Sequence, residues 1–217
     1  PRYISTVDSG NLAGHLLTLR QGVFSISTQP VLGPKLFEGV NDCFQLLCDL
    51  QPKSETLSTF QVQLDLCRTL TPFNLPSLKS LLDELVLTAE QINKEIAFGA
   101  EGQSFYWGQA VLQQCKDIRE ELVLLSPWVL LPRAPGALNG LFSADTVVTL
   151  PELAAMEDTL AAEIKEFPEG TLTDDESSWL ENFSVQVAKS SLLARQRLAT
   201  IDEIGMICIE LADMQFD

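Results

Sequence analysis

The chain has 217 residues, of which 46% are hydrophobic and 20% are charged, and its formal net charge is −16 at pH 7. This composition is typical of a globular protein and excludes a disordered one. The acidic excess disfavours binding to nucleic acid or to an anionic membrane surface, because both depend on clustered Lys and Arg side chains. A neutral sugar remains a compatible ligand.

Five cysteines stand at irregular spacing without a C-x-x-C pair. This pattern predicts buried free thiols in a reducing compartment rather than a disulfide framework or a zinc site. The longest apolar run, near residues 122–131, is broken by Ser126 and Pro127. It falls short of the roughly 20 apolar residues that a membrane span needs, so no direct membrane contact is expected in this segment.

Residues 1–8 are predicted to form an extended lead-in, because aromatic and β-branched side chains favour strand-like geometry there. Asp8 or Ser9 is then expected to cap a helix over residues 10–21. The apolar face of this helix is predicted to consist of Leu12, Leu16 and Leu19.

Apolar residues at helical spacing predict six further helices. They cover residues 36–49, 56–70, 77–98, 104–125, 150–167 and 173–213. Pro151 falls in the first turn of one helix, where proline is tolerated. Thr173 and Glu176 form a capping-box pattern at the start of the last helix. With little strand signal, the predicted fold class is all-α.

Residues 126–148 are rich in proline and glycine and are predicted to form a loop. This segment is the best candidate for a hinge between subdomains.

The first sixteen residues, PRYISTVDSGNLAGHL, are dense in polar chemistry. The side chains of Asp8, Ser9 and Asn11 can form hydrogen bonds with the hydroxyl groups of a sugar. Inside a helix, Gly10 and Gly14 each cost about 1 kcal/mol of stability relative to alanine. Close packing or the approach of a ligand would explain why glycine stands at these two positions. The alternative interpretation is that the polar side chains simply cap a helix.

Residues 1–19 closely resemble the segment R-Y-[IV]-S-T-V-D-S-G-N-L-A-G-H-L of cyclic β-1,2-glucan synthases. Residues 212–217 resemble the beginning of that family's next barrel segment. In the family, this region lies between a membrane-embedded glycosyltransferase and a C-terminal phosphorylase-like domain. It is similar to glucoamylase-type (α/α)₆ toroids, and it closes the glucan ring by transglycosylation.

The resemblance implies a partial (α/α)₆ toroid with a helical insertion. Residues 1–22 would hold the sugar-site motif and the first barrel helix, residues 23–211 a helical insertion or bundle, and residues 212–217 the start of the next barrel segment. Both ends of the chain are accordingly expected to be cut points within a longer protein.

The resemblance also implies site residues and partners. Asp8 would bind substrate, with Ser9 and Asn11 as neighbours, whereas the two carboxylates of a retaining transglycosylase are expected outside this chain. No metal or cofactor is expected. The partners would be β-1,2-glucan or a glucooligosaccharide and other domains of the same polypeptide. The segment would lie on the cytoplasmic side of an inner-membrane protein.

Two classes of function therefore stay open. The chain is either a catalytically incomplete fragment of a carbohydrate-active enzyme, or a non-catalytic helical spacer or docking module within a large multidomain protein. The sole histidine, His15, is expected to be a packed, hydrogen-bonded side chain. Phe105, Tyr106 and Trp107 are expected to combine core packing with partial exposure, with Tyr106 on the buried side of its helix, rather than to form a sugar-stacking platform.

Overall fold

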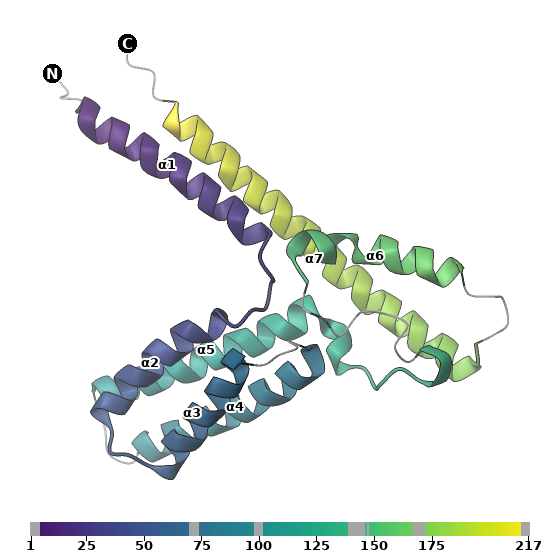
Figure 1. The fold of residues 1–217 in the computed structure, drawn as a ribbon, viewed down its shortest axis with the longest axis horizontal. Coiled ribbons are helices and arrows are strands. Elements are labelled where there is room, and N and C mark those ends of the chain that lie inside the picture. Colours follow the sequence, from purple (N-terminus) through teal and green to yellow (C-terminus); the bar gives the residue numbers. More distant parts are fainter. Residues whose placement is uncertain are drawn as a thin grey trace. The chain divides into compact units, whose positions relative to one another are not determined.

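The computed structural model describes residues 5–69, 74–97, 102–138, 146, 148–166 and 172–213. Within these residues the chain forms α-helices, two short 3₁₀-helices and isolated β-bridges (Figure 1). The predicted all-α fold class is therefore confirmed. The elements are α1 (Thr6–Ser27), α2 (Leu36–Leu50), α3 (Glu55–Thr69), α4 (Leu75–Ala97), α5 (Gln103–Leu125), η1 (Pro127–Leu130), η2 (Gly136–Leu138), α6 (Leu150–Lys165) and α7 (Asp174–Ala212).

The helices from α2 to α7 begin and end within two residues of their predicted bounds. Their start signals act as expected from the sequence. At the start of α7, the backbone N–H of Thr173 donates to the Glu176 carboxylate (2.9 Å), and the backbone N–H of Glu176 donates to the Thr173 hydroxyl (3.3 Å). The predicted capping box is thus confirmed. Thr149 and Glu152 form a second capping box before α6, with Pro151 in its first turn.

The prediction for the first helix is wrong at both ends. α1 begins at Thr6, so residues 6–8 are helical rather than an extended lead-in, and the helix continues to Ser27. Ser5 is the N-cap, because its backbone is extended and its hydroxyl accepts a hydrogen bond from the N–H of Asp8 (3.3 Å). Residues 1–4 lie outside the described residues.

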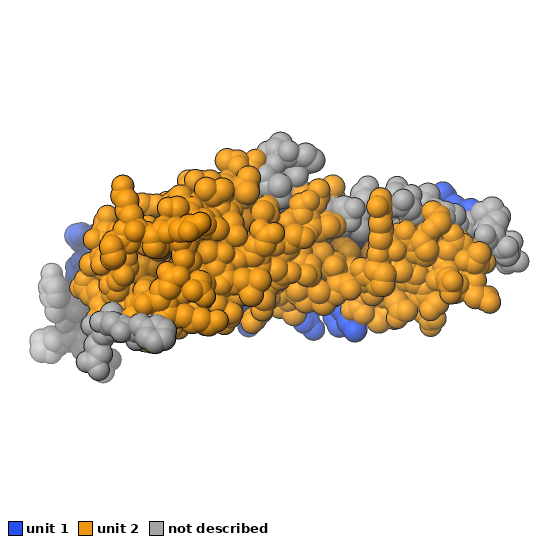
Figure 2. Space-filling model, turned by 90° about the horizontal axis from the view of Figure 1, so that it is seen from below, with its two compact units in different colours: residues 1–31, 148–167, 188–217 blue, residues 32–147, 168–187 orange. Residues whose placement is uncertain are grey.

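The chain forms two compact units, which Figure 2 colours separately. Unit 1 comprises residues 1–31, 148–167 and 188–217, and unit 2 comprises residues 32–147 and 168–187. α7 contributes its first part to unit 2 and its remainder to unit 1. The roles assigned from the family resemblance to residues 1–22, 23–211 and 212–217 stay predictions, and residues 214–217 lie outside the described residues.

Unit 2 is built around the helices α2 to α5. α4 packs against both α3 and α5, and α5 packs against α2. Phe44 of α2 and Phe60 of α3 meet with their ring centroids 4.6 Å apart. Burying a side chain of this size contributes about 1.5–3 kcal/mol. The largest fully buried side chains of these helices include Phe37, Phe44, Phe60, Leu64, Leu82, Leu85 and Leu122.

The first part of α7 joins unit 2 through aromatic contacts. The indole N–H of Trp179 donates to the carbonyl of Pro132 at 2.8 Å. The Trp179 ring stacks on Phe183 at 5.0 Å, and Phe183 in turn meets Trp128 edge-on at 6.1 Å. Trp128 is buried. Both tryptophans therefore contribute to packing, with the polar edge of Trp179 satisfied by the backbone.

Unit 1 contains α1, α6 and residues 188–212 of α7. The buried hydroxyl of Ser191 on α7 donates to the carbonyl of Leu153 (2.8 Å) and accepts from the N–H of Glu157 (3.1 Å), both on α6. Arg195, one turn further along α7, forms an ion pair with Glu157 at 3.0 Å. These contacts fix α6 along α7 in a single register.

α1 and residues 188–212 of α7 run antiparallel as a helical hairpin in unit 1 (Figure 1). A glycine on α7 makes room for an aromatic side chain of α1. Gly205 is buried, and a Cβ atom added there would lie 2.6 Å from Cζ of Phe24 on α1. The Phe24 ring also lies under the guanidinium of Arg20, 4.9 Å away.

A buried amide joins α4 to α5 in unit 2. The side-chain NH₂ of Asn93 donates to the carbonyls of Ala89 (2.9 Å) and Gly108 (2.8 Å), and its oxygen accepts from Gln109 (2.9 Å). Gly108 suits this close packing, because an added Cβ would lie 3.0 Å from Cδ1 of Ile96 and 3.1 Å from the Asn93 oxygen. Both N–H donors of this buried amide and its oxygen are thus hydrogen-bonded.

We predict that Asn93→Ala lowers the free energy of unfolding by about 1–3 kcal/mol, because it leaves buried polar groups unsatisfied. Asn182→Ala is the matched control, since the exposed Asn182 amide bonds only to the carbonyl of Ser178 in its own helix. Urea unfolding followed by circular dichroism measures both variants. Equal losses of stability in the two would contradict the role given to the Asn93 network.

Candidate functional site

The predicted sugar-binding residues lie in the first two turns of α1. Asp8 and Asn11 are exposed and stand at neighbouring positions one turn apart on the helix. Ser9 is half-buried, and its hydroxyl donates to the carbonyl of Ser5 at 2.9 Å. Because successive helix residues are about 100° apart, Ser9 points away from the side that carries Asn11. The structure thus brings two of the three residues together, and their binding of sugar stays a prediction.

Two glycines of the same motif are not explained by packing within the described chain. A Cβ atom added at Gly10 or Gly14 would meet no atom within 4 Å. Close packing against the described residues, one of the two expected explanations, is therefore excluded for these two glycines. The approach of a ligand or of another protein segment remains as the explanation.

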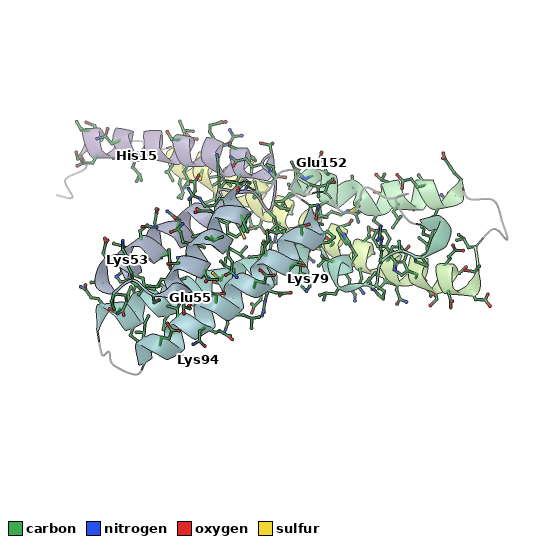
Figure 3. The ribbon with its side chains drawn as sticks, turned by 60° about the horizontal axis from the view of Figure 1, so that its bottom comes forward. His15, Lys53, Glu55, Lys79, Lys94 and Glu152 are labelled. Atoms are coloured by element: carbon green, nitrogen blue, oxygen red, sulfur yellow. The ribbon has the colours of Figure 1, made fainter. Side chains whose placement is uncertain are left out.

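His15 is exposed on α1 (Figure 3), so the expectation of a packed histidine is wrong. The expectation assumed that the apolar residues around it would all be covered. In the structure, only one side of α1 is covered by α7, and His15 lies outside that side.

The aromatic residues at the start of α5 are more exposed than predicted. Tyr106 is 64% exposed and Phe105 is 43% exposed, while Trp107 is half-buried and meets the Tyr106 ring edge-on at 5.0 Å. The placement of Tyr106 on the buried side is therefore wrong. The buried face of α5 begins at Gly108 and continues through Val111 and Cys115. Tyr106 lies about 200° from Gly108 around the helix, which turns it to solvent.

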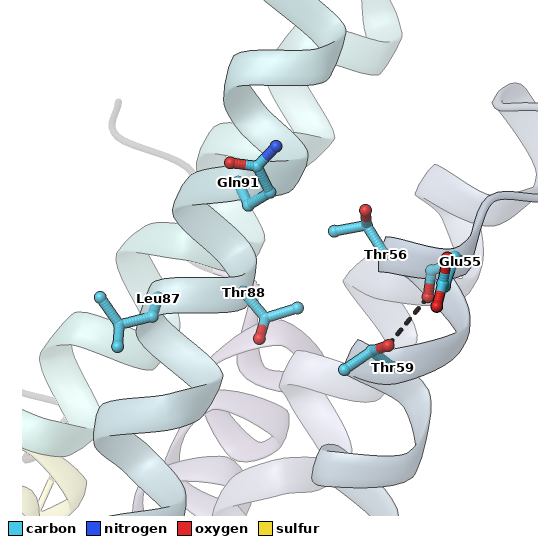
Figure 4. A pocket seen from close by; sticks show the side chains of 6 residues that line it. All are labelled: Glu55, Thr56, Thr59, Leu87, Thr88 and Gln91. Atoms are coloured by element: carbon cyan, nitrogen blue, oxygen red, sulfur yellow. Dashed lines mark hydrogen bonds between the residues drawn. The ribbon is translucent and has the colours of Figure 1, made fainter.

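A cleft of about 380 Å³ lies between α3 and α4 in unit 2 (Figure 4). Three threonine hydroxyls line it together with one carboxylate, one amide and one apolar side chain. The lining residues are Glu55, Thr56, Thr59, Leu87, Thr88 and Gln91. The sequence analysis missed this cleft, because it arises only from the alignment of two helices. Its sole sequence signal is the run of short hydroxyl residues at helical spacing.

The described residues hold no group of three or more His, Cys, Asp or Glu side chains that could bind a metal ion. All five cysteines are free thiols, as predicted, and Cys67, Cys115 and Cys208 are buried. Burial raises the pKa of the Cys67 and Cys115 thiols to about 12 each. In the parts of the chain that the structure describes, no helix is long and apolar enough to cross a membrane.

The hairpin of unit 1 exposes many large apolar side chains. Six of them form what we call the hairpin face, and each is between 38% and 63% exposed. They are Leu12, Leu19, Ile26, Ile204, Ile207 and Leu211. Isolated exposed apolar residues are common on proteins, but a contiguous group marks an interaction surface.

Helix geometry places these six residues on one side of the hairpin. Leu12, Leu19 and Ile26 are seven residues apart and so form one line along α1, and Ile204 and Leu211 do the same on α7. On α7 this line is about 110° around the helix from Gly205, and on α1 it is about 140° from Phe24, the residue that faces Gly205. Because the two helices are antiparallel, the two lines fall on the same side.

The α1 half of the hairpin face is poor in charge as well as apolar, whereas on α7 the exposed Glu203 and Glu210 neighbour Ile207. Apart from His15, the 22 residues of α1 contain only Asp8 and Arg20 as ionisable residues. Leu16 and Val23 are half-buried and extend the line of Leu12, Leu19 and Ile26 in the 4-3 spacing typical of a coiled-coil seam. The spacing therefore indicates that the hairpin face packs against another helix.

We predict that Cys67 and Cys115 resist a thiol reagent at pH 8 in the folded chain, whereas half-exposed Cys43 reacts. Native labelling of Cys67 at the rate of Cys43 would contradict this.

The raised pKa values of Cys67 and Cys115 also predict that the free energy of unfolding falls as the pH rises from about 9 to 12. In that range the unfolded chain binds fewer protons than the folded one, so rising pH favours unfolding. Denaturant titrations across this pH range measure the effect.

Comparison of the chain with protein-family models, with curated proteins and with solved structures finds no match. The resemblance of residues 1–19 to cyclic β-1,2-glucan synthases therefore depends on the motif itself. What the chain does is inferred below from its own residues and their geometry.

Proposed function

We propose that this chain is a catalytically incomplete helical module of a carbohydrate-active enzyme, and that the hairpin face docks it onto another domain of the same polypeptide. The observation that carries the docking proposal is the exposed apolar face formed by α1 and α7, of which the α1 half is poor in charge. The motif in residues 1–19 supplies the enzyme class, because it resembles the cyclisation region of cyclic β-1,2-glucan synthases.

The apolar character of the hairpin face favours a permanent partner over a transient one. Permanent interfaces are more hydrophobic than transient interfaces and resemble a domain core cut in half. Burying each of its six side chains further would contribute at most about 1.5–3 kcal/mol. A partner in the same polypeptide avoids most of the entropic cost of association, which is estimated at about 4–15 kcal/mol for separate molecules.

In this proposal α1 serves as the first barrel helix of an (α/α)₆ toroid, and residues 212–217 begin the next barrel segment. The helices between them form the insertion. The first turn of α1 and the last turn of α7 lie at the same end of the hairpin (Figure 1), as an insertion between consecutive barrel segments requires. The parent enzyme would lie in the inner membrane, with this segment on the cytoplasmic side.

We predict that Leu19→Gln combined with Ile204→Gln abolishes docking without unfolding the chain, because both side chains are already exposed. The measurement is binding of the purified chain to the neighbouring parent segments, expressed as separate polypeptides. Leu17→Gln is the matched control, since Leu17 is 51% exposed but lies on the opposite side of α1.

Equal weakening by Leu17→Gln and by the double variant would show that the hairpin face is not the docking surface. If the chain instead forms dimers that only the double variant dissociates, a second copy occupies the face.

A second candidate function is direct binding of β-1,2-glucan at the start of α1. It is favoured by the exposed pair of Asp8 and Asn11 and by Gly14, one turn beyond Asn11, where the helix surface is open. A carboxylate and an amide one turn apart can bond adjacent hydroxyl groups of one sugar ring. The missing Cβ atom of Gly14 lets that ring approach the backbone.

We predict that Asp8→Asn weakens binding of linear β-1,2-glucooligosaccharides about tenfold or more, because a hydrogen bond to a charged group contributes about 1.5–3 kcal/mol. Isothermal titration calorimetry measures this on the full chain. Asp42→Asn makes the same change of charge at an exposed position of α2 and should leave the affinity unchanged. Equal affinities of the Asp8→Asn variant and the unaltered chain would refute the site.

A further inference from the structure

Two carboxylates border the hairpin face on its α7 side. Ile204 and Leu211 share one position of a seven-residue repeat and Ile207 takes the second apolar position, which gives the 3-4 spacing of a coiled-coil seam. Glu203 and Glu210 then fall together on the flank of this seam that lies away from α1. In coiled coils, charged side chains at the flanking positions set the choice of partner. This flank is therefore the part of the hairpin face that can distinguish one docking segment from another.

Neither flanking carboxylate has a cationic partner among the described residues. Glu203 and Glu210 are exposed, and they take part in none of the ion pairs that the described residues form. No Lys or Arg stands three or four residues from either of them in the sequence, where an ion pair along the helix would need it. Both charges are therefore available to a docking segment.

The end of α7 is a second reason to expect a positive charge on the partner. The free carbonyl groups at a helix C-terminus carry a partial negative charge, which cations stabilise. The last turn of α7 contains no Lys or Arg, and Glu210 adds a further negative charge to it. A cation on the docking segment would stabilise both the carboxylate and the helix end.

The corresponding flank of α1 differs. It consists of Asp8, His15 and Gly22, which are exposed and follow one another at intervals of seven residues. Its one carboxylate, that of Asp8, lies in the first turn of the helix, and Gly22 has no side chain at all. The acidic charge beside the apolar seam is thus concentrated on α7. The requirement for charge falls on the part of the partner that packs beside α7.

We propose that the segment that docks on the hairpin face is an amphipathic helix with two basic side chains on one flank, which pair with Glu203 and Glu210. The inference rests on the docking function proposed above and defines the chemistry of the partner. The apolar stripe of the partner helix packs against Ile204, Ile207 and Leu211. Its two cations stand about 10 Å apart, the rise of seven helix residues. An acidic flank in the same place would bring like charges together and so exclude the wrong partner.

The test uses the full chain and two synthetic helical peptides of three heptads, with leucine at positions a and d and glutamine at b, c and f. One peptide has lysine at e and g and the other has glutamate, so like charges keep each from pairing with itself. Fluorescence anisotropy at an ionic strength of about 150 mM, where diffuse attraction is screened, measures both dissociation constants. We expect the lysine peptide to bind about tenfold more tightly, because two ion pairs replace two like-charge contacts.

Glu203→Lys combined with Glu210→Lys should abolish this preference for the lysine peptide. Both positions are exposed, so the fold tolerates the change. Asp42→Lys combined with Asp49→Lys is the matched control, because it changes the net charge equally at two exposed positions of α2 that are also seven residues apart. The control should keep the ratio of the two dissociation constants within about twofold, since these charges lie far from the seam and are screened.

The possible results separate this inference from the docking function on which it rests. If the unaltered chain binds both peptides equally, or if the two pairs of substitutions have equal effects, the basic flank is wrong while docking through the apolar seam stands. If neither peptide binds, or if Leu19→Gln combined with Ile204→Gln leaves binding unchanged, the hairpin face does not accept a helix and both proposals fail.

Discussion

Unit 2 depends on the burial of one face of α4. The helix packs against α3 on one side and α5 on the other, so its apolar stripe fixes the positions of both neighbours. Asn93 interrupts this stripe with a polar side chain whose partners come from α4 and α5. Because a buried amide tolerates few alternative arrangements, this network selects one register between the two helices. The stripe consists of Leu78, Leu82, Leu85, Ala89, Ile92 and Ile96.

Most helices could be predicted from the sequence because their apolar periodicity and their start signals agree. The start of α1 could not, because Ser5, Asp8 and Ser9 are all good capping residues and the sequence does not rank them. The extended preference of Thr6 and Val7 amounts to at most about 1 kcal/mol, which one capping hydrogen bond offsets. Tertiary contacts then stabilise the helix as far as Ser27.

Exposure was harder to predict than helicity. The spacing of Leu12, Leu16 and Leu19 is that of a core stripe, yet only Leu16 is half-buried in the structure. Periodicity shows that a face is apolar, but not which neighbouring element covers it. Tyr106 and His15 were misplaced for the same reason. The cleft between α3 and α4 could not be predicted from the sequence, because Thr56 and Glu95 meet only when the two helices align.

The two candidate sites on α1 make different demands on one helix. Docking uses the line through Leu12 and Leu19, whereas sugar binding uses Asp8 and Asn11 at the open end. Both are compatible, because a partner that covers the apolar line would also form one wall beside the polar residues. A wall of this kind would turn a convex helix surface into the concave surface that sugar sites need. The domain contact would then help to build the site.

α7 has a thermodynamic consequence of its own. Residues 174–187 of this helix belong to unit 2 and residues 188–212 to unit 1, without a break between them. Helix formation is cooperative, because extending a helix is much easier than nucleating one. Each unit therefore lowers the nucleation cost for the other. Local opening in one unit should raise the rate of backbone hydrogen exchange in the other, so the two units would melt as one cooperative system.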